Sequence, residues 1–258
     1  MGDAWSDMWT YLGSDRAWTG NNGLPLLLWA HLKLWFATVV IAALLAIPPA
    51  AVLGHTRRGA FLGISIVNIG RAIPTYGIVA LVLPFSLRWG FGLGFWPTLV
   101  ALVLLAVPPI FTNTYIGVRD VPADAVEAAQ GMGMRAGELV RQVEVPAALP
   151  LILTGLRVSA VQVMATATLG ALVGYACLGS PIATGLRISN KGPMLAASIL
   201  VAVLALLTDG LFAVAQRLLV PWSRRTGRPR RFRRSDRSRE VAEAAATAGG
   251  RVLTTDTR

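Results

Sequence analysis

Several predominantly apolar runs of about twenty residues constrain this chain more than any other feature of its sequence. They cover approximately residues 34–53, 61–83, 95–116, 151–175 and 194–218. An α-helix needs about 20 predominantly apolar residues to cross the hydrocarbon core of a bilayer, and an ordinary soluble core needs no such lengths. The sequence therefore predicts an all-α integral membrane protein with about five transmembrane helices.

The composition leaves little room for enzymatic chemistry. Of the 258 residues, 54% are hydrophobic and 14% are charged. The single cysteine, Cys177, excludes an intramolecular disulfide and a cysteine-cluster metal site. His31 and His55 lack the spacing of metal ligands, and we expect the first at the membrane interface and the second in a loop. Because the sequence contains no phosphate-binding Walker motif and no suggestive serine, histidine and acid set, we expect neither enzymatic activity nor a cofactor.

The chain divides into three expected segments. Residues 1–28 form an N-terminal external or interfacial segment, residues 29–220 a transmembrane domain, and residues 221–258 a basic, disordered tail. The tryptophans at the N-terminus suit a membrane–water interface, where an amphipathic ring is stabilised. A floppy N-terminus with scattered aromatic residues is an equal alternative.

The basic residues predict an orientation, because Lys and Arg concentrate in cytoplasmic loops. If the apolar runs alternate in direction, one side of the membrane receives the larger group, Arg57, Arg58, Arg119, Arg135, Arg141 and the arginine-rich tail. The other side receives Arg16, Arg88, Arg187 and Lys191, with Lys33 near its edge. We therefore expect the N-terminus outside, and the C-terminus and the loop after the third run in the cytoplasm.

The second run is the least regular, because Arg71 and Pro74 interrupt it. A charge inside a span is costly and usually faces a water-lined or protein interior. Arg71 and Pro74, together with the polar Gln162 and Thr166 of the fourth run, are our candidates for a translocation path. For Arg71 we favour a shallow position from which its side chain snorkels to the cytoplasmic headgroups. A break at Pro74 would turn the first half of this run into an interfacial segment.

The fourth and fifth runs carry further informative residues. Small and hydroxyl residues such as Ser159, Ala160 and Ala165 are frequent in the fourth run, and they allow membrane helices to approach closely. We interpret this run as a pore-lining or subunit-facing helix, with packing inside the chain as the alternative. In the fifth run, Asp209 has two alternatives, a pair with Arg157 or a position near the cytoplasmic edge. We expect the second.

A polar loop, residues 117–147, separates the third and fourth runs. Asp120 and Pro122 predict the start of a helix, and Gly131 and Gly133 predict its end. A second short helix is expected from residue 135 to about 143, with Pro146 as its stop. Two short helices joined at a glycine form a knob that is too polar for lipid. Such a knob between two spans is typical of a docking surface for a soluble partner.

The loop resembles the EAA signature of ABC-importer permeases. The residues that carry the resemblance are Glu127, Ala128, Ala129, Gly133, Val143, Val145 and Pro146. Valine stands at 143 and 145, where the family pattern has isoleucine and leucine. The longer stretches 120–134 and 146–174 are most similar to permeases for osmoprotectants such as glycine betaine, carnitine, choline and proline betaine.

The resemblance implies a type I permease fold in which these seven residues couple the chain to a cytoplasmic ABC ATPase. It also implies an external substrate-binding protein, a second permease subunit (a second copy or a similar paralogue), and a multi-pass position in the inner (plasma) membrane of a bacterial cell. The implied function is that of half the translocation pathway of an ATP-driven importer for a quaternary amine or betaine.

Two alternatives remain at this point. Within the family, the substrate could be another small solute such as methionine. From a different class, the chain could be a secondary transporter or channel that works without ATP, although such proteins normally show paired halves and no internal repeat is apparent here.

The tail carries nine arginines within residues 224–239. A basic cluster just cytoplasmic of a span attracts anionic lipid headgroups, and our candidates for this contact are Arg224, Arg225, Arg228, Arg230 and Arg231. A tail that only reinforces topology is the alternative. We expect no nucleic-acid partner.

Overall fold

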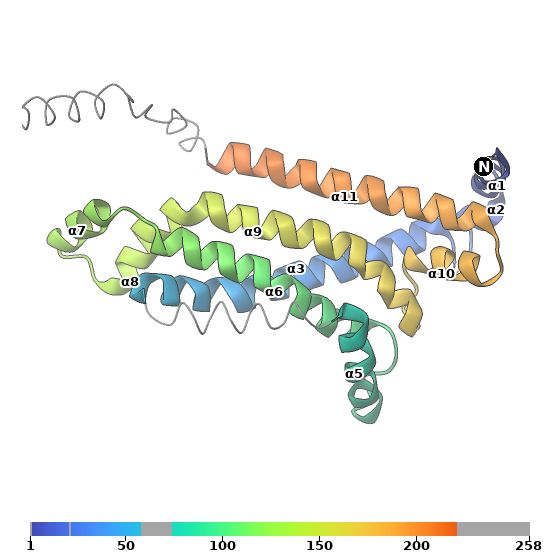
Figure 1. Cartoon of the computed structure of the whole chain (residues 1–258), viewed down its shortest axis with the longest axis horizontal. Helices are drawn as coiled ribbons and strands as arrows, with labels where there is room; N and C mark the ends of the chain where they lie inside the picture. The colour runs from blue at the N-terminus through green and yellow to red at the C-terminus, as the bar shows by residue number, and fades with distance from the viewer. Residues whose placement is uncertain (1, 21, 58–73, 221–258) are drawn as a thin grey trace, which may run out of the picture. The chain divides into compact units, whose positions relative to one another are not determined.

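The computed structural model describes residues 2–20, 22–57 and 74–220. Residue contacts divide the chain into the units Met1–Val220 and Pro221–Arg258, and the described residues all belong to the first. In Figure 1 their helices are α1 (Gly2–Leu12), α2 (Asp15–Trp18), α3 (Leu24–Thr56), α5 (Thr75–Arg88), α6 (Phe95–Arg119), α7 (Ala123–Gly131), α8 (Ala136–Leu139), the π-helical turn η1 (Val140–Glu144), α9 (Val145–Thr166), the 3₁₀ segment η2 (Ala167–Val173), α10 (Gly179–Arg187) and α11 (Lys191–Leu219).

Among the described residues, four helical segments are long and apolar enough to cross a membrane. They are α3, α6, α11 and the continuous helical stretch Ala136–Val173 that contains α9. The 33 residues of α3 correspond to about 50 Å at 1.5 Å per residue, which exceeds the roughly 30 Å of a bilayer's hydrocarbon core. The prediction of an all-α membrane protein is confirmed.

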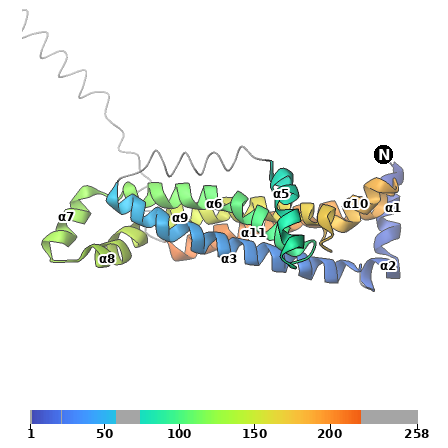
Figure 2. The ribbon, with the colours of Figure 1, turned by 90° about the horizontal axis from the view of Figure 1, so that it is seen from below.

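The long helices pack with α6 between α3 and α9, and α11 lies on α9 (Figures 1 and 2). On α3, the fully buried Ala42, Ala46 and Ala50 recur every four residues and so share one face of the helix. Leu102 and Ile110 of α6 belong to the same buried cluster. Small residues on one helix and large ones on the other allow close packing without a water-driven hydrophobic effect inside the membrane.

Most of the second predicted span lies outside the described residues, and Arg71 with it. Pro74 precedes the first turn of α5 with φ −58° and ψ 130°, an extended conformation, and proline fits there because it has no N–H to donate. α5 has only 14 residues, contacts α6 and turns away from the four long helices (Figure 1). A helix start after Pro74 is therefore observed, while the count of five spans stays a prediction.

Residues 2–12 and 15–18 are helical, so the alternative of a floppy N-terminus is wrong. α1 packs across the start of α11; it is seen end-on in Figure 1 and lengthwise in Figure 2. The close approach depends on Gly192, because a Cβ at this position would lie 2.6 Å from the carbonyl oxygen of Asp7. Any side chain at 192 would push α1 away from α11.

Candidate functional site: the loop between α6 and α9

The polar loop folds into two short helices, α7 and α8, joined by the turn at residues 132–135. α7 contacts α8 and η1, and the loop buries two apolar side chains, Ala129 at 2% and Leu139 at 1% exposure. The backbone N–H of Arg135 donates to Glu138 Oε2 at 2.9 Å, which satisfies one of the donors that a helix leaves unpaired at its start. The loop is therefore an ordered knob with a small core of its own.

Gly133 sits at the turn between the two helices with φ +83°. Residues with a Cβ rarely adopt this left-handed conformation, and glycine adopts it freely. Nothing lies within 4 Å of the place where a Cβ would stand, so the constraint at this position comes from the backbone alone. The prediction that the two short helices are joined at a glycine is confirmed.

The remaining signature residues divide between the surface and the base of the loop. Glu127 and Ala128 are exposed on α7, whereas Ala129 faces inward. Val143 and Val145 are half-buried where the loop joins α9. The loop thus presents an acidic side chain on a free helix face and places its aliphatic residues against the spans.

Two details of the predicted loop are wrong. Pro146 does not stop a helix: it lies in the first turn of α9, directly after the π-helical turn η1. Helical backbone therefore runs from Ala136 through η1 into the membrane span. Asp120 does not cap α7 either, because it is the residue at which α6 ends, and Pro122 precedes α7.

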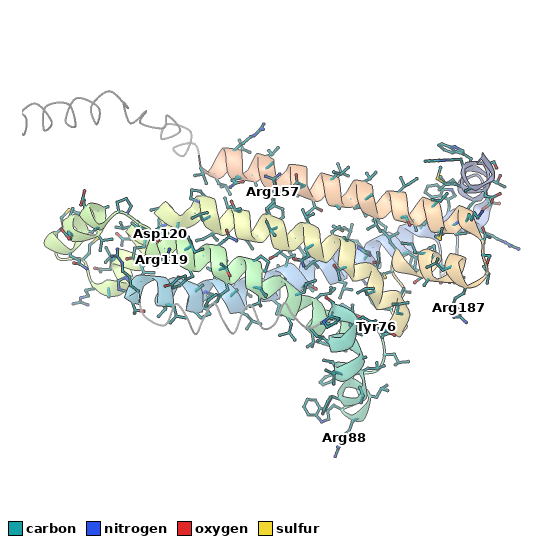
Figure 3. The ribbon with its side chains drawn as sticks, in the orientation of Figure 1. Tyr76, Arg88, Arg119, Asp120, Arg157 and Arg187 are labelled. Carbon is teal, nitrogen blue, oxygen red and sulfur yellow. The ribbon has the colours of Figure 1, made fainter. Side chains whose placement is uncertain are left out.

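An ion pair marks the end of α6. Arg119 Nε lies 2.7 Å from Asp120 Oδ1, and the guanidinium lies 5.5 Å from the ring of Tyr115. The hydrogen bond from Arg119 holds the pKa of the Asp120 carboxyl below its usual range. Figure 3 places this pair at the end of the bundle that carries α7 and α8, and Arg187 at the opposite end.

At the base of the loop, an apolar cluster joins three spans. Its buried members are Ala51 of α3, Val118 of α6, and Ala148 and Ile152 of α9. One polar contact adjoins it: His55 Nδ1 lies 2.9 and 3.0 Å from the two carboxylate oxygens of Glu144. The interpretation of His55 as a loop residue is wrong, because it lies in the last turn of α3.

Charged and polar side chains also connect α9 with α11. Arg157 Nε and Nη2 each lie 2.6 Å from one oxygen of Asp209, and Figure 3 shows Arg157 on the side of α9 that faces α11. Nearer the loop, Gln216 Nε2 donates to the carbonyl oxygen of Pro150 at 3.0 Å. The expectation that Asp209 lies apart from Arg157 is wrong, and the sequence held a signal for the pair in two opposite charges on successive spans.

His31 is also placed differently from the expectation. It is fully buried and its Nε2 lies 2.9 Å from the carbonyl oxygen of Met164 on α9, so it is not exposed at an interface. The cause is the small-residue surface of α9, which allows α3 to approach closely enough for a ring to reach its backbone.

The described candidate path residues come from two places in the chain, and two of them are neighbours on α9, where the Thr166 hydroxyl donates to the carbonyl oxygen of Gln162 at 2.8 Å. Gln162 is exposed and Thr166 half-buried on the outer face of α9, and Pro74 lies before α5. In the same helix Ser159 is fully buried and donates to the carbonyl oxygen of Ala106 at 2.8 Å. Packing inside the chain therefore covers part of the small-residue surface of α9. Gln162 lies on the part of α9 that stays exposed.

A metal site is not formed by the described residues, since no group of three His, Cys, Asp or Glu side chains among them could hold an ion. The candidate lipid-binding arginines, Arg224, Arg225, Arg228, Arg230 and Arg231, lie outside the described residues.

A matching family model and two curated relatives of this chain are all components of membrane transport systems. The sequence model of a family described as "Binding-protein-dependent transport system inner membrane component" matches residues 39–220. The choline transport system permease protein OpuBB of Bacillus subtilis (strain 168) is 36% identical over 203 residues, which is 78% of this chain and 91% of that protein. The carnitine transport permease protein OpuCB of Listeria monocytogenes is 34% identical over 210 residues, 81% of this chain and 94% of that protein.

A solved structure shares the fold. One chain of the MetNI methionine ABC transporter in an inward-facing conformation superposes with a TM-score of 0.66 at 23% identity, covering 74% of this chain and 93% of that chain. At this identity the likeness concerns the fold alone. The family match, by contrast, runs from within α3 to the residue after α11 and includes the whole loop.

Proposed function

Because the chain belongs to the family of binding-protein-dependent transport system inner membrane components, we propose that it couples the transport of a small osmoprotectant to a cytoplasmic ATPase. In this proposal the chain forms half of the translocation pathway of an ATP-driven importer. The relatives named above are a choline permease and a carnitine permease, which supports a quaternary amine or betaine as the substrate class.

The observation that carries the proposal is the ordered knob between two membrane spans. It is built around Gly133 at φ +83°, it presents Glu127 on an exposed helix face, and it continues without a helix break into α9. A rigid body attached directly to a span is suited to pass a displacement into the membrane, because helices transmit motion along their length with little deformation. Glu127, Ala128, Ala129, Gly133, Val143, Val145 and Pro146 are the coupling residues of this proposal.

The orientation and the partners follow from the same interpretation. Arg119, Arg135 and Arg141 lie in or beside the loop, which supports a cytoplasmic loop and C-terminus and an external N-terminus. The ATPase would then contact α7 and α8, and an external binding protein the opposite end near α10. A second permease subunit, either another copy or a paralogue, would complete the pathway, with Gln162 and Thr166 as path candidates on the open face of α9.

Reconstitution tests the proposal. The chain, its ATPase and its binding protein in vesicles should take up labelled glycine betaine, choline or carnitine only when ATP is supplied on the side of the ATPase. Labelled methionine serves as the control solute. Uptake that is independent of ATP and the ATPase would indicate a secondary transporter, and uptake of methionine alone would assign the chain to another solute.

A further inference from the structure

The last turn of α3 carries a polar contact with the loop that the sequence did not predict. His55 precedes the final residue of α3, and its Nδ1 reaches both carboxylate oxygens of Glu144 at 2.9 and 3.0 Å. Glu144 is the last residue of η1, directly between the signature residues Val143 and Val145. The contact therefore joins the first long span to the point at which the loop becomes α9.

The burial of Glu144 makes this contact a strong restraint. Its side chain is 5% exposed and that of His55 23% exposed. In the part of the chain that the structure describes, His55 supplies the side chain that satisfies this carboxylate. A buried carboxylate that loses its partner is left with an uncompensated desolvation cost, so moving Glu144 away from His55 is unfavourable.

The connectivity of the chain gives the contact its significance. α6 and α9 are attached covalently to the two ends of the loop, so a displacement of the loop reaches them through the backbone. α3 has no direct covalent link to the loop, and the described residues join the two through side chains. The apolar cluster of Ala51, Val118, Ala148 and Ile152 is non-directional, whereas a hydrogen bond fixes both distance and direction.

We infer that the His55–Glu144 contact makes α3 move together with the loop, an inference that rests on the proposed function. At the same level, α3 is packed tightly on α6, since a Cβ at Gly54 would lie 2.8 Å from Val118 Cβ. The end of α3 is thus held by α6 on one side and by Glu144 on the other. In this inference His55 and Glu144 are positioning residues, which bring a third span into the movement that the ATPase causes.

The test compares solute transported per ATP hydrolysed in vesicles matched for permease content. His55→Leu removes the donor and should lower this ratio at least about fivefold, within the range of typical coupling energies, while the ATPase still copurifies. His55→Asn keeps an N–H near the Nδ1 position and should stay close to the wild type. Thr56→Ala, on the exposed neighbouring residue of the same turn, is the matched control and should not change the ratio.

A second measurement compares one protein before and after cross-linking, so differences in stability between variants do not affect it. In a His55→Cys/Glu144→Cys protein the contact is absent, and a short bifunctional thiol reagent that joins the two positions should raise the transport per ATP. A ratio that falls or stays constant on cross-linking would show that α3 and the loop need not move together.

The outcomes separate the inference from the function on which it rests. A wild-type protein without ATP-dependent transport would overturn the proposed function. A coupled wild type with an equally coupled His55→Leu variant would overturn the role of the contact alone.

Discussion

At residue 133 the backbone adopts φ +83°, a conformation that costs an L-residue about 1–2 kcal/mol. We predict that Gly133→Val, which adds a β-branched side chain there, leaves the protein inserted in the membrane but distorts the turn between α7 and α8. ATP-dependent uptake and copurification of the ATPase should both fall. Uptake in matched vesicles and quantitative pull-down of the ATPase measure the two effects.

Gly137 provides the control for this prediction. It is exposed, lies inside α8, and has no atom within 4 Å of the place where a Cβ would stand. Gly137→Ala should therefore be neutral or stabilise the loop by up to about 1 kcal/mol, with uptake unchanged. Equal losses in both variants would show that any side chain at the tip of the loop disturbs docking, and that the left-handed turn is not the cause.

Residue-level prediction from the sequence succeeded where one residue determines its own conformation. Gly133 is such a case, because the glycine requirement is local. It failed for His31, His55 and Asp209, whose surroundings depend on which helices are neighbours and how each is rotated. A single sequence contains the spacing along each helix but not the pairing between helices. The contacts of His31 with Met164 and of His55 with Glu144 were therefore not predictable, and the Arg157–Asp209 pair could be named only as one of two alternatives.

The α9–α11 pair shows how two elements are held in register by a charge pair inside the membrane. Arg157 and Asp209 are bonded through two hydrogen bonds of 2.6 Å. Asp209→Leu would leave the guanidinium without its carboxylate next to lipid, which is unfavourable. We predict that this variant melts at a lower temperature than the Arg157→Leu/Asp209→Leu double variant, because replacing a whole ion pair by apolar side chains removes the unpaired charge.

Thermal unfolding of the purified protein in detergent measures this order. The wild type is the reference, and Gln216→Leu, which removes another polar link between α11 and α9, serves as the comparison for loss of a neutral hydrogen bond. If the double variant melts at a lower temperature than Asp209→Leu, the prediction is wrong. The ion pair would then stabilise the folded protein by more than the cost of leaving Arg157 unpaired.

α1 presents three faces, one packed on the bundle, one aromatic and one polar, as expected for a helix that lies in a membrane interface. Met8 is buried at 4% exposure against the bundle, Trp5 and Trp9 are 54% and 66% exposed, and Thr10 is exposed on the polar side. Successive residues of a helix are 100° apart, so the two tryptophans share one face between the packed side and the polar side. Tryptophan is enriched at this depth of a bilayer.

We predict that a fluorophore on Trp9→Cys contacts lipid and one on Thr10→Cys faces water. In vesicles that contain lipid spin-labelled near the headgroup, quenching should be stronger, and the emission bluer, at position 9 than at position 10. The neighbouring positions are matched in depth along α1. Equal quenching would place this face of α1 in water or against another protein.

Element-level prediction succeeded for the long apolar helices and failed at their ends. Apolar runs of sufficient length force a helix in lipid, because each backbone polar group must be satisfied within the segment. The start of α9 is different: Pro146 permits both a helix start and a helix stop, and its position in the first turn depends on η1 before it.

At the scale of the molecule, the loop and the α10–α11 turn lie at opposite ends of the bundle (Figures 1 and 2). They are separated by α9 and η2, which together exceed the thickness of the hydrocarbon core, about 30 Å. We therefore expect the two ends on opposite sides of the membrane, with the loop in the cytoplasm according to the positive-inside rule. Single cysteines at the two ends test this assignment.

The wild-type sequence is a suitable background for the test, because its single cysteine, Cys177, should not react with the reagent. Cys177 is fully buried, and burial raises the pKa of its thiol. A raised pKa lowers the fraction of reactive thiolate at neutral pH, and labelling of the wild type should appear only after denaturation.

Ser189→Cys lies on the exposed turn before α11 and Gly137→Cys on the exposed face of α8. We predict that a membrane-impermeant maleimide labels Ser189→Cys in intact cells, and labels Gly137→Cys only after the cells are opened. Labelling of Gly137→Cys from outside would invert the topology, and the loop could then not reach a cytoplasmic ATPase.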